Sequence, residues 1–362
     1  MKVNRKSGDA AVVLNQVVKQ YTPGSAPAVD RISLQFDSGR LTTLLGPSGC
    51  GKTTMLNIMS GIVRPSEGRL LFDGVDVTEH TTAERNIAQV FQFPVIYGTM
   101  TVQDNLAFPL VCRGYDKAFI KAKVAEVSEA LNLEDLLTQS ANKLTADQKQ
   151  LISLGRGLVR DNVAAVLMDE PLTVIDPDLK FRLRRKLKEI NQKYRSTLIY
   201  VTHDQNEAMT FAENIIVMDQ GNIVQAGTPS ELFDRPKTTF VGYFIGAPAM
   251  NLFACSAVNN TTISFGGAEI VTDTNLEAVA SKNLKLGIRS EYIKLATASA
   301  ENTVSAKVQR VEDLGNHKLV TADFQGQSIK VKVKREQELP AENVFLTIPA
   351  QHCCVYENEH LI

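Results

Sequence analysis

The chain has 362 residues, of which 44% are apolar, so it can bury a substantial core and is long enough for two or more domains. Its formal net charge of -1 provides no basic field for holding nucleic acid or an anionic membrane surface. The apolar runs are far shorter than the roughly 20 residues that cross a bilayer, so we expect no transmembrane helix.

The N-terminal segment and the cysteines both favour a cytoplasmic protein. Residues 1–15 contain basic side chains, but no long apolar region precedes a small-residue cleavage site, so we expect no secretion signal. The five cysteines lack paired CxxC or Cys/His metal spacing, which favours free thiols over disulfides and metal sites. These cysteines are Cys50, Cys112, Cys255, Cys353 and Cys354.

The first half of the chain has the pattern of an α/β domain. Residues 11–35 alternate between apolar and polar around the turn YTPGSAP, which predicts antiparallel strands. Residues 41–46, 163–168 and 196–202 read as short buried strands, and helical spacing follows the first of them. Strands separated by helices predict a parallel sheet with its reactive loops at the carboxyl ends.

Further along, the pattern changes twice. Residues 118–137 have the spacing of a surface helix, and we place a helical subdomain at about residues 94–158. Residues 215–227 predict a hairpin that turns at Gln220-Gly221. Beyond about Gly246, short strands separated by Asn, Gly and Asp turns predict an all-β domain. We therefore expect an α/β domain over residues 1–238 and a β domain over residues 239–362.

Residues 46–53 match the phosphate-loop pattern G-x-x-x-x-G-K-[ST], between a predicted strand and a predicted helix. Glycines let the backbone N–H groups point at phosphate, and the positive end of the helix adds to this field. Lys52 should reach the β- and γ-phosphates, while the Thr53 hydroxyl should bind Mg²⁺. This context makes a chance glycine-rich turn a poor alternative. The predicted phosphate-binding residues are Gly46, Pro47, Ser48, Gly49, Cys50, Gly51, Lys52, Thr53 and Thr54.

Two acidic residues end the predicted strand at residues 163–168. We expect Asp169 beside the metal ion and Glu170 in a position to orient or activate water. Such a pair alone is weak evidence, because it could merely cap the next segment. Together with the phosphate loop, the pair predicts phosphoryl transfer.

With these motifs the chain resembles the ATP-binding subunits of ABC transporters, in particular those of the maltose-type carbohydrate importers, over nearly its whole length. The resemblance implies that Tyr21 stacks on adenine, with a packed strand-end aromatic as the alternative. It implies that Gln92, at the end of RNIAQVFQ, contacts Mg²⁺ or water; otherwise this glutamine is a surface residue. His203 in VTHDQNEA would contact the γ-phosphate and hold the attacking water with Glu170.

Other segments extend the resemblance. Asp176 in TVID would lie at the interface between two ATPase subunits, although the three residues before it differ from the family's usual Ser-Asn-Leu. FIGAPAMNLF and LGIRSEYIKL resemble the start of the family's C-terminal regulatory domain of OB-like strands.

The segment LTADQ stands where the family has its signature LSGGQ. The resemblance implies that it faces the nucleotide of the partner subunit. An Asp147 carboxylate about 4 Å from a phosphate oxygen would cost roughly 1 kcal/mol in water and about 4 at an effective dielectric of 20. The Ala146 methyl would be harmful if φ must be positive. Alternatively, Asp147 caps its helix and points away from nucleotide. The segment comprises Leu144, Thr145, Ala146, Asp147 and Gln148.

The resemblance implies an ATPase, with ATP and Mg²⁺ as cofactors, that energises the import of a small sugar or a glycerol-like polyol at the cytoplasmic face of the membrane. Its partners would be two permease subunits and a second ATPase subunit, either a different chain or another copy. A solute-binding protein would act indirectly. The apolar stretch VFQFPVIYGTM is a candidate groove for a permease helix, with a buried strand and turn as the alternative.

Two other functions remain as alternatives. An ABC-type ATPase acting on nucleic acid or the ribosome would use the β domain as an oligonucleotide binder. The charge balance and the scarcity of aromatics among basic residues disfavour it, so we expect no nucleic-acid partner. A regulatory subunit that binds ATP without turnover is disfavoured because Glu170 and His203 are both present.

Overall fold

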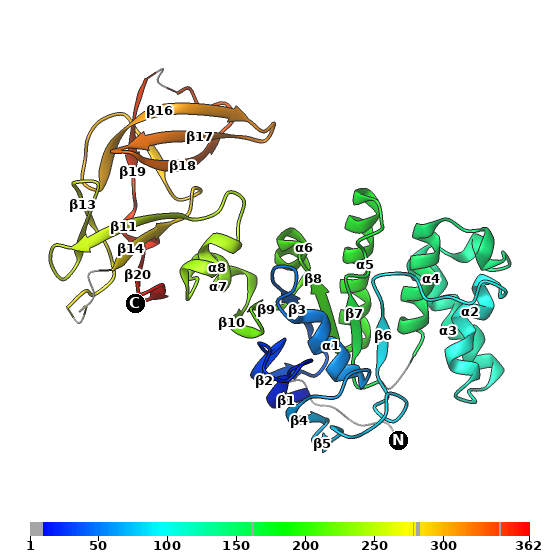
Figure 1. Ribbon diagram of the computed structural model, residues 1–362. Coiled ribbons are helices and arrows are strands. Elements are labelled where there is room, and N and C mark those ends of the chain that lie inside the picture. The colour runs from blue at the N-terminus through cyan, green and yellow to red at the C-terminus, as the bar shows by residue number, and fades with distance from the viewer. Residues whose placement is uncertain (1–9, 161–162, 278, 280–282, 340–341) are drawn as a thin grey trace. The chain divides into compact units, whose positions relative to one another are not determined.

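The computed structural model describes residues 10–160, 163–277, 279, 283–339 and 342–362 (Figure 1). The first nine residues, on which the expectation about secretion largely depends, lie outside these ranges. The chain divides into two compact units, Met1–Pro229 and Ser230–Ile362. The boundary predicted after residue 238 falls between α7 (Pro229–Asp234) and α8 (Thr239–Phe244). Within the described ranges, each helix is too short or too polar to cross a membrane.

The first unit begins with an antiparallel sheet in the order β2-β1-β4-β5. The alternation between residues 11 and 35 correctly predicts the pairing of its first two strands. Apolar side chains such as Leu14 and Phe36 are buried in one hydrophobic core together with side chains of the second sheet of this unit. The strands are β1 (Ala10–Lys19), β2 (Val29–Asp37), β4 (Glu67–Phe72) and β5 (Val75–Asp76).

A second sheet has the order β10-β9-β3-β8-β7-β6. The predicted parallel sheet is confirmed, because all of its strands except β10 run parallel. The strand expected at residue 163 begins three residues later. The strands are β3 (Leu41–Leu45), β6 (Ala88–Val90), β7 (Val166–Asp169), β8 (Leu198–Thr202), β9 (Asn214–Asp219) and β10 (Asn222–Gly227). The connecting helices are α1 (Lys52–Ser60), α5 (Pro177–Tyr194) and α6 (Gln205–Phe211).

The hairpin predicted at residues 215–227 is confirmed as β9 and β10. Gln220 and Gly221, which join the strands, both have positive φ, of 45° and 79°. Two left-handed residues match the right-handed twist of a tight antiparallel pair.

A helical subdomain interrupts the parallel sheet between β6 and β7. The helix expected over residues 118–137 ends earlier, because Asn132 adopts the left-handed conformation, with φ 52°. The later residues of the predicted helix, Glu134–Leu136, form a short 3₁₀ helix. The elements are α2 (Val102–Val111), α3 (Lys117–Leu131), η1 (Glu134–Leu136), η2 (Ala141–Lys143) and α4 (Ala146–Leu158).

The second unit contains the predicted all-β domain, preceded by α7 and α8. One sheet has the order β13-β12-β11-β14-β20-β21 and the other the order β15-β19-β16-β17-β18. Their strands are β11 (Asn251–Ala257), β12 (Thr262–Phe265), β13 (Ala268–Val271), β14 (Leu284–Ile288), β15 (Lys294–Ala296), β16 (Thr303–Asp313), β17 (His317–Phe324), β18 (Gln327–Lys334), β19 (Asn343–Thr347), β20 (Cys354–Glu357) and β21 (His360–Leu361), with η3 (Ala350–His352) before β20.

A buried cation holds α7 and α8 to this β domain. Arg289, directly after β14, is 1% exposed. Its Nε donates to the Phe233 carbonyl at 3.0 Å, and Nη1 donates to the carbonyls of Gly242, at 2.8 Å, and Ile245. Its guanidinium also lies 4.4 Å from the centroid of the Phe233 ring. Burial lowers the pKa of Arg289, and the carbonyls and the ring face compensate part of its desolvation.

Candidate functional site

The glycine-rich loop between β3 and α1 has the backbone of a phosphate-binding loop. Gly49 and Gly51 have φ of 82° and 105°, which side-chain-bearing residues rarely adopt. A Cβ on Gly46 would come within 2.3 Å of the Met218 carbonyl oxygen, so this position admits only glycine. Gly51 caps α1 without any side chain. The first N–H groups of α1 are therefore directed at whatever lies in the loop, as anion binding requires.

Lys52, at the start of α1, lies beneath this loop. It is 5% exposed, and its Nζ donates to the carbonyls of Gly46, at 2.8 Å, and Pro47, at 2.9 Å. The buried Cys50 Sγ is 3.7 Å from the same Nζ. Burial raises the pKa of the Cys50 thiol more than the lysine lowers it, so the thiol is protonated and a poor nucleophile at neutral pH.

Four polar side chains meet at the carboxyl ends of β7 and β8. Thr53 Oγ1 donates to Asp169 Oδ1 at 3.1 Å. His203 Nδ1 lies 2.9 Å from Glu170 Oε1. Burial raises the pKa of Asp169, and the hydrogen bond from Thr53 opposes this effect. Thr173, one of the residues that depart from the family pattern, donates to Glu170 Oε2 at 3.3 Å.

Glu170 has an unusual backbone. Its φ is 44°, in the left-handed region, while its N–H still donates to the Val201 carbonyl at 3.0 Å. A non-glycine residue in this conformation is strained, and the hydrogen bond from the Glu170 N–H to Val201 in β8 holds the backbone in it. The conformation turns the carboxylate towards His203.

A cavity of about 430 Å³ joins these groups to the phosphate loop. Its lining includes the predicted residue Gln92, and also Ala28, which the sequence analysis misses. Three predicted residues of the phosphate loop, Gly46, Pro47 and Cys50, lie outside the lining. The complete lining is Ala28, Ser48, Gly49, Gly51, Lys52, Thr53, Thr54, Gln92, Asp169, Glu170 and His203.

Tyr21 follows β1 and is 60% exposed, so the packed strand-end alternative is wrong. Its hydroxyl lies 3.4 Å from Thr54 Oγ1, beside the cavity, and Lys19 Nζ is 5.2 Å from the centroid of its ring. An exposed ring at this place is available for stacking.

The chain matches two family descriptions, "ABC transporter" over residues 29–173 and "TOBE domain" over residues 286–355. It is 36% identical, over 356 residues, to the sn-glycerol-3-phosphate import ATP-binding protein UgpC of Yersinia enterocolitica, covering 97% of this chain and 98% of that protein. It belongs to the ABC transporter ATP-binding proteins. UgpC of Vibrio cholerae is 37% identical over 337 residues, covering 93% of this chain and 89% of that protein.

Solved structures of ABC transporter cassettes agree with this assignment. The cbiO1 protein of Clostridium perfringens, part of the transporter complex cbiONQ, superposes with a TM-score of 0.58 at 25% identity, over 63% of this chain and 92% of that one. A dimeric bacterial cassette superposes with a TM-score of 0.54 at 26% identity, over 60% of this chain and 98% of that one. Membership identifies the protein as a nucleotide-binding ATPase.

The signature segment of this ABC protein forms the start of α4. Thr145 Oγ1 accepts from the Gln148 N–H at 3.3 Å, and the Gln148 side chain accepts from the Thr145 N–H at 3.0 Å. This is a capping box. The capping side chain is therefore Thr145 rather than Asp147, and Asp147 lies half-buried in the first turn, where its charge suits the helix dipole. Ala146 has no positive φ, so its methyl causes no backbone strain.

The signature residues and Asp176 do not line the 430 Å³ cavity. Leu144 is buried. Asp176 caps α5 by accepting the Leu179 N–H at 3.0 Å.

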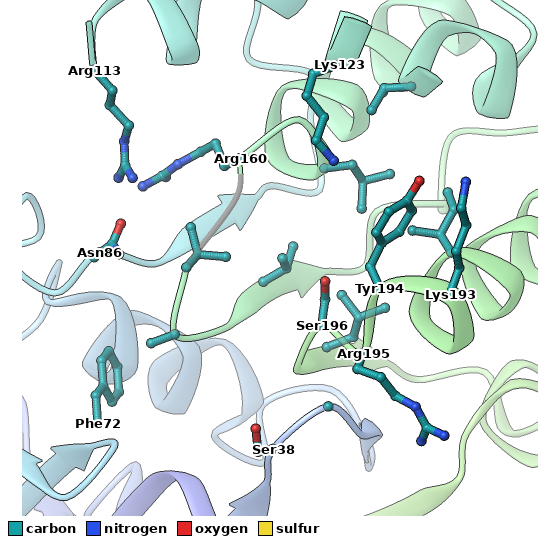
Figure 2. A pocket seen from close by; sticks show the side chains of 18 of the residues that line it. Ser38, Phe72, Asn86, Arg113, Lys123, Arg160, Lys193, Tyr194, Arg195 and Ser196 are labelled. Carbon is teal, nitrogen blue, oxygen red and sulfur yellow. The ribbon is translucent and has the colours of Figure 1, made fainter. Parts of the chain in front are cut away.

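A larger cavity, of about 1350 Å³, lies near the amino ends of the same strands (Figure 2). Its lining includes Val166 and Leu198, the first residues of β7 and β8. Figure 2 shows the guanidinium groups of Arg113 and Arg160 side by side at one end. Ligands of open α/β sheets bind at the carboxyl ends of the strands, so we assign nucleotide to the smaller cavity.

An alanine at Gly51 tests the backbone of the phosphate loop. Its Cβ would meet the Ala28 carbonyl oxygen at 2.2 Å and would force a strained φ. We expect affinity for a fluorescent ATP analogue to fall about tenfold or more, which corresponds to at least 1.4 kcal/mol. Gly74→Ala is the matched control, because Gly74 also has positive φ but a Cβ there meets nothing within 4 Å. Equal affinities for the two variants would contradict the prediction.

Proposed function

We propose that the chain is the ATP-hydrolysing subunit of an importer for a small sugar or polyol. The observation that supports hydrolysis most strongly is the pairing of Glu170 with His203, 2.9 Å apart, in the cavity that the phosphate loop also lines. The relatives named above are import ATP-binding proteins for sn-glycerol-3-phosphate. We propose a glycerol-like cargo on that basis.

Each group has a role in hydrolysis. The N–H groups of the loop and the Lys52 ammonium bind the β- and γ-phosphates. Glu170 orients the attacking water and accepts its proton, while His203 hydrogen-bonds to the γ-phosphate and holds the carboxylate in place. Tyr21 stacks on the adenine ring.

A Mg²⁺ ion fits the polar groups at one side of the cavity. Thr53, Gln92 and Asp169 offer a hydroxyl, an amide and a carboxylate oxygen, the type of ligand that Mg²⁺ prefers. Within the described ranges, no cluster of three or more His, Cys, Asp or Glu residues could hold a metal alone. A site with so few protein ligands suits a Mg²⁺ ion that is held mainly by the phosphates of the nucleotide. The ion would neutralise part of their charge.

The segment around Gln92, residues 90–100, supports docking of a permease. Phe91, Phe93, Val95 and Tyr97 are 36%, 68%, 53% and 41% exposed, so the alternative of a buried strand is wrong. This apolar segment is fastened to α4, the signature helix, by several hydrogen bonds. They run from Gln150 Nε2 to Phe91 O at 3.0 Å, from Val95 N to Ser153 Oγ at 3.3 Å and from Arg156 Nη1 to Val95 O at 2.6 Å. A permease helix bound here would be coupled mechanically to the signature.

We propose that a second ATPase subunit with an intact signature closes the site of this chain, while LTADQ faces the partner's nucleotide. The two ATPase subunits would lie at the cytoplasmic face of the membrane, bound to two permease subunits, and a solute-binding protein would act from the other side. The test is to purify the tagged chain from gently solubilised membranes and to weigh the complex. Two different ATPases with two permeases would support the proposal, and two copies of this chain would contradict it.

Asp147 provides a separate test of the altered signature. Replacing Ala146 and Asp147 by glycine should raise ATP turnover of the purified complex at least several-fold, because the like charge would cost roughly 1 to 4 kcal/mol and about 1.4 kcal/mol is already a factor of ten. Asp147→Asn removes the charge but keeps the side-chain volume, and it should give most of the gain. Unchanged turnover in both variants would show that this carboxylate does not act on nucleotide.

A nucleic-acid function predicts salt-dependent retardation of DNA or RNA by the purified chain. The import function predicts no retardation. Retardation at physiological salt would reverse our preference between the two.

A further inference from the structure

A buried carboxylate lies shortly after His203, in the first turn of α6. Glu207, on α6, is 5% exposed. Its Oε2 accepts hydrogen bonds from the hydroxyls of Tyr200 and Thr202, each at 2.9 Å. Its Oε1 pairs with Arg184 Nη1, on α5, at 3.4 Å. Three donors from two other elements thus compensate the desolvation of one charge.

The Thr202 hydroxyl connects this carboxylate to the backbone around His203. It donates to Glu207 and accepts the Asp204 N–H at 3.0 Å, so it bonds across the residue that carries the imidazole. The Asp204 side chain in turn caps α6 by accepting the Asn206 N–H at 2.8 Å. The residues on both sides of His203 are therefore fixed.

The His203 side chain itself is 54% exposed, and its Nδ1 contacts Glu170. An imidazole with so little packing is directed mainly by the backbone that carries it. That backbone is in turn fixed by Thr202, Asp204 and the buried carboxylate.

We propose that Glu207 is a positioning residue for ATP hydrolysis, which acts by fixing the turn that carries His203 through the Thr202 hydroxyl. The inference rests on the proposed role of His203. Through Arg184, the same carboxylate ties this turn to α5, which begins after Asp176, the residue expected at the subunit interface. Glu207 thus joins the γ-phosphate contact to the segment that a partner subunit would touch.

Thr202 allows a sharp test because it has an isosteric variant. Thr202→Val removes only the hydroxyl, whereas Thr202→Ser keeps it. We would measure ATP hydrolysis by the full-length chain together with the subunits that copurify with it. We expect Thr202→Val to lower kcat about tenfold with KM for ATP within about twofold, because a displaced imidazole affects the rate rather than binding. Thr202→Ser should keep at least half of the activity.

Thr210→Val is the matched control. Thr210 is exposed on the same helix, and its hydroxyl donates to the main-chain carbonyls of Asn206, at 2.6 Å, and Glu207, at 3.4 Å, but not to the Glu207 carboxylate. This variant should leave kcat unchanged. An equal loss in Thr210→Val and Thr202→Val would mean that α6 is merely sensitive to substitution, and would overturn the inference.

Combination with His203→Ala separates the inference from the proposed function. If Glu207 acts through His203, Thr202→Val adds no further loss in the His203→Ala background. If His203→Ala alone leaves kcat unchanged, the proposed role of His203 fails. The positioning role of Glu207 is wrong if His203→Ala lowers kcat and Thr202→Val in that background lowers it further by the same factor as in the native chain. It is also wrong if Thr202→Ser fails to preserve activity.

Discussion

Replacing Glu170 by glutamine is expected to lower the kcat of ATP hydrolysis at least a hundredfold while ATP binding is retained. An amide cannot accept the proton of the attacking water, and general-base catalysis contributes roughly 10²- to 10⁴-fold. The amide oxygen can still accept a hydrogen bond from His203 Nδ1, which is 2.9 Å away in the native site. The geometry should therefore survive, and only the proton transfer should be lost.

The measurement is steady-state ATPase activity, together with titration of a fluorescent ATP analogue. Glu134→Gln is the control, because Glu134 is exposed in η1 of the helical subdomain, away from the cavity. Activity of the Glu170 variant within threefold of the native value would exclude this carboxylate as the base. A parallel loss of ATP binding would indicate a distorted site instead.

Removing the Lys52 ammonium is expected to weaken ATP binding about a hundredfold and to abolish turnover. Hydrogen bonds to charged groups contribute about 1.5 to 3 kcal/mol, and the upper end corresponds to about two orders of magnitude in Kd. Lys52→Ala also leaves the carbonyls of Gly46 and Pro47 without the donor they have in the native loop. We therefore expect a lower melting temperature as well.

Calorimetric titration with ATP, and a thermal melt without it, would separate these two effects. Lys117→Ala is the matched control, because Lys117 is exposed at the start of α3. Native affinity in Lys52→Ala would remove the lysine from phosphate binding. A large fall in melting temperature with native affinity would give it a structural role alone.

Local patterns predicted the parts of the site that lie close together in sequence. The phosphate loop, the Asp169-Glu170 pair and the presence of a parallel sheet could be predicted because spacing and strand ends determine them. Thr145 and Gln148 could also have been assigned, because T-x-x-Q before a helix is the pattern of a capping box.

The remaining features depend on contacts between distant segments. Glu207 stands in the quoted motif VTHDQNEA, but its partner Arg184 belongs to a different helix, and no spacing rule connects them. Ala28 lines the cavity because the loop after β1 returns beside Gly51. Such features follow from tertiary packing, which a linear pattern does not record.

The carbonyls that accept hydrogen bonds from Arg289 determine where the chain can be truncated or joined to a relative without loss of these bonds. They belong to Phe233, Gly242 and Ile245, which all precede the first strand of the β domain. A C-terminal fragment that began at Gly246 would keep the guanidinium and lose all three acceptors. A chimera with a relative should therefore be joined before α7, so that the arginine and its carbonyls come from the same parent.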